Sequence, residues 1–81
     1  MESIKDSWKI RIHSSPEILG GKPVIKGTRI SVSFILNLIS NGATFEEIMD
    51  EYKDLSRDDI KACIAYAIHL IDLKEPSRLS A

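Results

Sequence analysis

The side chains of this 81-residue sequence that could perform chemistry are few and widely spaced. His13 and His69 have no second histidine or cysteine at a spacing that would complete a metal site. His13 precedes two serines, but no acid is placed to orient its imidazole for nucleophilic catalysis. Cys63 lacks a CxxC partner and stands at helical spacing from apolar residues, which is typical of a small buried side chain. We therefore expect no catalytic residue, no metal and no cofactor.

Two further patterns suggest ligands but have simpler explanations. Gly20-Gly21-Lys22 lacks the G-x-x-x-x-G-K-[ST] spacing of a phosphate loop, and Pro23 removes a backbone donor where a helix would begin. We interpret it as a turn in which backbone passes close to a helix. The acidic pairs Glu46-Glu47 and Asp58-Asp59 fall in the first turns of predicted helices, where the helix dipole accounts for them. The sequence thus predicts a protein that is not an enzyme.

Length and charge indicate a single domain with two electrostatically different parts. Residues 1–30 hold six Lys/Arg and three Asp/Glu, whereas residues 31–81 hold five and nine. We divide the chain into a basic strand segment (1–30), a three-helix bundle (31–75) and a tail (76–81). A polyanion would be attracted to the first part only. The lone cysteine, and the lack of an apolar signal or membrane segment, predict a cytoplasmic location.

The basic segment has the patterns of short strands. Trp8, Ile10 and Ile12 alternate with polar residues, which predicts a half-buried strand with a cationic outer face. Strand-forming residues over 24–30 flank Lys26-Gly27, where glycine permits a tight turn, so a small hairpin or bent strand is expected. Such a piece is unstable alone and must pack on the helices or on another chain.

Three helices are predicted after residue 30. Ser31 caps a first helix that ends at Asn41-Gly42, and Thr44 opens a capping box for a second helix over residues 45–52. Ser56 precedes a third helix that runs from Ile60 to about residue 73. The connections are short, so the predicted fold class is mainly α, a three-helix, homeodomain-like helix-turn-helix bundle with a short N-terminal β hairpin segment.

The third helix carries more apolar surface than one bundle uses. One apolar stripe comprises Ile60, Ile64, Ala67 and Ile71, and a second comprises Ala62, Tyr66, Leu70 and Leu73. One stripe is expected to face the core. The other would meet a second protein chain or lie under the strands. We expect a homodimer or higher oligomer, with an interface formed by Tyr66, Leu70 and Leu73.

A motif in the basic segment resembles that of a known family. The string P-x-I-x-G-G-K-P-x-I-x-G-T-R-I, residues 16–30, together with the helical residues 42–48 and 58–62, is similar to the DUF433 family from about Ile10 to Leu70. The resemblance implies a small homeodomain-like antitoxin, similar to VapB-type proteins, encoded beside a PIN-like ribonuclease toxin. It further implies inhibition of that toxin by direct binding, dimerisation and repression of its own operon.

Charged residues provide candidates for contacts with such partners. Acids on the second helix are candidates for the ribonuclease-like toxin: Glu46, Asp50 and Glu51. Cations, most of them in the basic segment, are candidates for operator DNA: Lys9, Arg11, Lys22, Lys26, Arg29, Arg57 and Lys61. Arg29 could instead pair with an acid on the second or third helix. A stand-alone DNA-binding regulator remains the alternative function.

Overall fold

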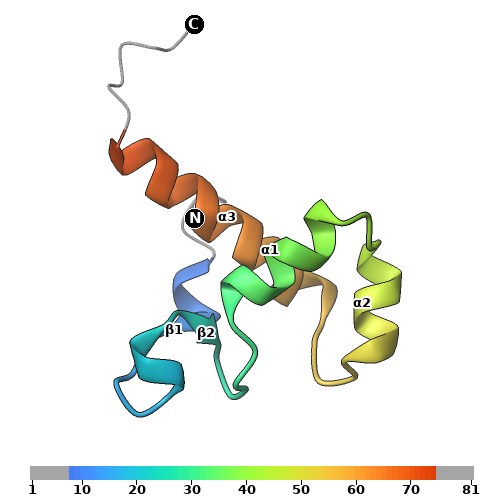
Figure 1. The fold of residues 1–81 in the computed structure, drawn as a ribbon, viewed down its shortest axis with the longest axis horizontal. Helices are drawn as coiled ribbons and strands as arrows, with labels where there is room; N and C mark the ends of the chain where they lie inside the picture. Colours follow the sequence, from blue (N-terminus) through green and yellow to red (C-terminus); the bar gives the residue numbers. More distant parts are fainter. Residues whose placement is uncertain (1–7, 75–81) are drawn as a thin grey trace, which may run out of the picture.

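A computed structural model describes residues 8–74 as three helices and a two-stranded sheet (Figure 1). The mainly helical fold with an N-terminal hairpin is therefore confirmed, while the tail 76–81 lies outside the described residues. The elements in chain order are β1 (Ile12–His13), η2 (a 3-10 turn, Leu19–Gly21), β2 (Val24–Ile25), α1 (Val32–Ser40), α2 (Phe45–Glu51) and α3 (Arg57–Lys74).

The two strands pair antiparallel in a short hairpin, with Ile12 opposite Ile25. Their connection contains η2, in which Leu19 has a φ of 48° and Gly20 and Gly21 have φ of 67° and 92°. Open space surrounds both glycines, so they are needed for their left-handed backbone conformation and not for a close approach. The expectation that this turn brings backbone close to a helix was therefore wrong.

The first strand is much shorter than its alternating pattern predicted. Residues 8–10 form a 3-10 turn, and the Arg11 amide donates to the Trp8 carbonyl at 2.9 Å. Ile10, placed on the buried face by the pattern, is 61% exposed. Because β2 pairs over only two residues, the chain before Ile12 has no strand partner, and Trp8 packs against α3.

The starts and ends of α1 and α2 agree with the sequence signals. Ser31 accepts a hydrogen bond from the Phe34 amide at 3.0 Å, and Asn41 ends α1. Thr44 and Glu47 form the predicted capping box, in which each side chain accepts from the other residue's amide. The helix that follows ends one residue earlier than predicted. Side-chain caps thus define both helices, as expected where backbone donors lack helical partners.

The core lies where the first half of α3 meets the other elements. Its largest fully buried side chains come from β2 and from all three helices: Val24, Ile25, Ile35, Ile48, Ile60 and Cys63. α3 packs against α1, α2 and β1, so it is the common support of the domain. No helix in the described region has both the length and the apolar composition needed to cross a bilayer.

The two apolar stripes of α3 differ from the prediction, because within both stripes burial decreases from the start of the helix to its end. Ile60 and Ala62, from different stripes, are at most 1% exposed, whereas Leu70, Ile71 and Leu73 are 43, 52 and 69% exposed. α3 has 18 residues, but α1 and α2 have only nine and seven. At about 1.5 Å per residue the shorter helices cannot cover its full length. Its C-terminal turns consequently extend past them (Figure 1).

This contrast can be tested with one substitution at two positions of α3. Ile60→Val should lower the free energy of unfolding by about 0.5 to 1.5 kcal/mol, since it removes a methylene group from a filled core. Ile68→Val, at a side chain that is 49% exposed, should change it by less than about 0.5 kcal/mol. Urea unfolding of both variants measures the difference, and equal losses would contradict the lengthwise division of α3.

Candidate functional site

A carboxylate at the start of α3 joins the helical bundle to the hairpin. Asp59 Oδ2 accepts from the Ser56 amide at 2.9 Å, and the Asp59 amide donates to Ser56 Oγ at 3.1 Å. Arg11 Nη1 donates to Asp59 Oδ1 at 3.0 Å, and Arg11 Nη2 lies 3.7 Å from Asp58 Oδ2. The Asp59 side chain is only 15% exposed, so this ion pair is better shielded from water than a surface pair.

Two of the candidate DNA-binding cations are already paired within the protein. Arg11 holds Asp59, and Arg57 donates to Glu46 on α2 at 2.5 Å while its guanidinium lies 5.7 Å from the Phe45 ring centre. Arg29 was considered as the partner of a helix acid, but the structure assigns that role to Arg11, and no ion pair of Arg29 is found among residues 8–74. Arg11 therefore has a structural contact that its sequence position did not reveal.

The remaining candidate cations lie on exposed backbone turns and helix faces. Lys22 precedes β2, and Lys26 and Arg29 occupy the turn between β2 and α1. Thr28 fixes this turn, because its hydroxyl donates to the Ile25 carbonyl at 2.7 Å and accepts from the Ile30 amide at 3.0 Å. These hydrogen bonds define the conformation of the turn, which presents its two cations to solvent. Lys9 and Lys61 are also exposed.

An acidic face covers α2 and the residues that lead into α3. Residues 46–58 contain six acidic side chains, all exposed, and two cations. Glu46 pairs with Arg57, whose hydrogen bond holds the pKa of Glu46 below its ordinary value. Asp50 lies 3.2 Å from Lys53, and both side chains are largely exposed. Glu51 is exposed as well. The three predicted toxin contacts thus lie on one short helix.

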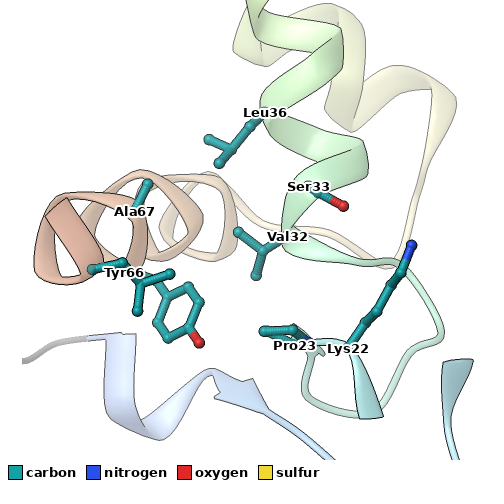
Figure 2. A pocket seen from close by; sticks show the side chains of 8 residues that line it. Lys22, Pro23, Val32, Ser33, Leu36, Tyr66 and Ala67 are labelled. Carbon is teal, nitrogen blue, oxygen red and sulfur yellow. The ribbon is translucent and has the colours of Figure 1, made fainter. Parts of the chain in front are cut away.

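An apolar groove of about 290 Å³ separates α1 from the second half of α3. Its walls are formed by Val32, Ser33 and Leu36 of α1 and by Tyr66, Ala67 and Leu70 of α3, and Lys22 and Pro23 lie at one end. Figure 2 shows the Val32, Pro23 and Tyr66 side chains converging on the groove, while the Lys22 ammonium points away from its interior. Sequence analysis selected Tyr66 and Leu70 but missed Pro23 and Ala67, because a small or cyclic side chain gives no periodic signal.

Trp8 covers part of α3 beside this groove. Its ring lies 4.8 Å from that of Tyr66, in an edge-to-face arrangement, and 5.0 Å from that of His69. The N-terminal segment therefore covers one side of the second apolar stripe, as one of the two alternatives proposed. Leu70 and Leu73 of the same stripe are 43 and 69% exposed. Within residues 8–74, the buried indole N–H of Trp8 has no hydrogen-bond partner.

The residues considered for catalysis do not converge. His13 is exposed on β1, whereas His69 packs against Trp8 and Cys63 is buried in the core. Burial, and secondly the charge of Asp59, raise the pKa of the Cys63 thiol to about 12. Within residues 8–74, no three side chains of the types that ligate metals come together.

The fold and these surfaces define a small helical domain with an acidic face, a basic turn and an apolar groove. The model of the family described as "Protein of unknown function (DUF433)" matches residues 12–67, and the chain belongs to this family. The expected family resemblance is thereby confirmed.

Two relatives show how far this similarity extends. The chain is 34% identical over 56 residues to "Uncharacterized protein y4eO" of Sinorhizobium fredii; this match covers 69% of the chain but only 25% of that protein. A crystal structure of a DUF433 member protein from Anabaena variabilis matches with a TM-score of 0.72 and 27% identity, over 78% of this chain and 62% of that one. The chain thus spans about a quarter of its curated relative.

The first prediction from this site concerns the ion pair between Arg11 and Asp59. Asp59→Asn should lower the free energy of unfolding by about 1 to 2 kcal/mol, because a partly shielded charged hydrogen bond is lost. Asp58→Asn is the matched control and should cost less than about 0.5 kcal/mol, since Asp58 is 68% exposed. A double-mutant cycle with Arg11→Gln in urea isolates the pair, and a coupling energy near zero would refute its structural role.

The second prediction concerns the buried thiol. Because the pKa of Cys63 is about 12 in the folded state and near 9.0 ordinarily, the unfolded chain loses its thiol proton first as pH rises. Stability should therefore decline between about pH 9 and 12 relative to Cys63→Ala, which lacks this proton. Thiol reagents should label Cys63 only after unfolding, and rapid labelling of the native protein at pH 8 would contradict its burial.

Proposed function

We propose that this protein is the antitoxin of a type II toxin–antitoxin system, which neutralises a PIN-like ribonuclease toxin by direct binding. The motif string at residues 16–30 supports this proposal by analogy with VapB-type proteins. The protein acts without catalysis, in the cytoplasm, and represses its own operon.

The observation that carries the proposal is the acidic face on α2. A ribonuclease has a cationic cleft for its RNA substrate, and a surface with six exposed carboxylates and two cations in 13 consecutive residues complements it electrostatically. Binding there would exclude RNA from the cleft. The existing ion pairs of Glu46 and Asp50 leave those side chains 69 and 83% exposed, so both carboxylates remain accessible to a partner.

Operator DNA would meet a different part of the molecule. In Figure 1 the hairpin and α2 lie on opposite sides of the central helices, so cations beside β2 are separated from the acidic face. If α2 and α3 act as a homeodomain-like helix-turn-helix, the first turn of α3 is poorly suited to read bases. Asp58 and Asp59 stand there, and Arg57 is paired with Glu46.

The second candidate function is a stand-alone DNA-binding regulator, which the turn between β2 and α1 favours. Its exposed Lys26 and Arg29, with Lys22 nearby, could contact phosphates, and an arginine can read guanine in the major groove.

One pair of titrations tests the proposal. The purified chain should bind the ribonuclease-like protein encoded next to it more tightly than its own upstream DNA at about 0.15 M salt, where weak phosphate contacts are screened. The double variant Asp50→Lys and Glu51→Lys should weaken inhibition of the nuclease about tenfold, mainly through slower association.

Glu17→Lys is the matched control, because Glu17 is an exposed acid in the loop that connects the two strands, away from α2. This variant should inhibit the nuclease as the parent does. Tight, sequence-specific DNA binding without any binding to the neighbouring protein would overturn the antitoxin proposal in favour of the regulator.

A further inference from the structure

The last two turns of α3 expose four large aliphatic side chains. They are 43 to 69% exposed: Ile68, Leu70, Ile71 and Leu73. The helical period places Leu70 and Leu73 on the same side as Tyr66, at positions i, i+4 and i+7, and turns Ile68 and Ile71 toward another side. Monomeric proteins rarely expose such contiguous apolar surface without a binding role.

The leucine side of α3 continues directly into the groove. Leu70 is at once an exposed side chain and part of the groove wall, and Leu73 stands one turn further along the helix. Ala67 lies between Tyr66 and Leu70 in this wall, and its small side chain leaves space in the groove. At about 290 Å³ the groove can admit a leucine side chain, since a cavity of about 150 Å³ holds benzene.

We propose that the occupant of this groove is a second copy of the chain. Two copies pack the C-terminal turns of their α3 helices antiparallel about a twofold axis near Leu70, and Leu73 of each copy enters the groove between α1 and α3 of the other. The groove is a homodimer interface, separate from the acidic face proposed to bind the nuclease.

Self-complementarity selects a copy of the same chain over a different partner. Leu70, which lines the groove, and the exposed Leu73 belong to the same helix. Their positions are about 4.5 Å apart along the helix axis. In a dimer with its twofold axis near Leu70, each copy therefore fills the groove of the other, and both Leu73 side chains are buried. Such an assembly closes at two subunits. Among residues 8–74, no segment fills the groove or covers Leu73, which is 69% exposed.

Charge also fits this arrangement. Asp72 precedes Leu73 in α3, and Lys22 lies at one end of the groove with its ammonium pointing away from the interior, toward solvent (Figure 2). Neither side chain forms an ion pair within residues 8–74. In the dimer, Asp72 of one copy approaches Lys22 of the other, so the rim of the interface carries opposite charges that fix its register.

The oligomeric mass gives the first test. The chain has a mass of 9.1 kDa, and light scattering at tens of micromolar should show twice that mass. Leu73→Lys should raise the dimer dissociation constant about a hundredfold, as the loss of a central apolar anchor does. Lysine near a helix C-terminus is compatible with the dipole, so the monomer should stay folded, as circular dichroism can verify.

The matched control is Ile68→Lys, which introduces the same charge at an exposed isoleucine on another side of α3. This variant should remain a dimer. A species of 9.1 kDa only, or a dimer that persists in Leu73→Lys, would overturn the proposal.

A crosslink tests the position of the contact independently of affinity. One copy with Leu73→Cys and one with Ser33→Cys should form a mixed disulfide on mild oxidation, because Ser33 lines the groove. The native Cys63 is fully buried and should not compete. Ile68→Cys in place of Leu73→Cys should give no such product; equal crosslinking from both positions would place the interface elsewhere. The nuclease-binding test changes Asp50 and Glu51 of α2, which do not line the groove, so either proposal can fail alone.

Discussion

The position of the hairpin on the helices depends on the carboxylate of Asp59, which binds one partner close in the sequence, Ser56, and one distant partner, Arg11. It accepts the Ser56 amide and so caps the start of α3, and it also receives the Arg11 guanidinium from the base of the hairpin. A two-residue sheet cannot hold its place by backbone pairing alone. The hairpin is therefore fixed by side-chain contacts with α3: the ion pair at one end and Trp8 against Tyr66 further along.

This arrangement makes α3 both the foundation of the fold and its most exposed element. α1, α2 and β1 all pack against it, and Ile60 and Cys63 in its first half are completely buried. Among residues 8–74, its second half is contacted by Trp8 and borders the groove that α1 lines on the other side. A fold this small has few residues with which to cover an 18-residue helix. The apolar turns at the end of α3 are exposed because α1 and α2 are much shorter than α3.

Features with a local cause were predictable from the sequence, and features with a distant cause were not. The caps at Ser31 and Thr44 follow from side chains three residues from their partners, so their positions were correct. The partner of Arg11 is 48 residues away, and nothing in the spacing distinguished it from Arg29. The alternation that predicted a longer first strand failed for the same reason, since a strand exists only where another strand pairs with it. The groove arises from three separate segments and could not be read from any one of them.

The contacts of the motif at residues 16–30 show which of its residues support the fold and which remain free to bind a partner. Gly20, Gly21 and Gly27 have positive φ in open space, so they serve backbone conformation. Val24 and Ile25 fill the core, and Thr28 ties the following turn by two hydrogen bonds. These contacts explain most of the string. They leave Lys22, Lys26 and Arg29 as exposed cations for which residues 8–74 provide no ion-pair partner. Lys26 and Arg29 lie on this hydrogen-bonded turn, and Lys22 lies before β2. Because no acid among residues 8–74 neutralises them, their charge stays available, so these three residues are where this motif can contribute to binding.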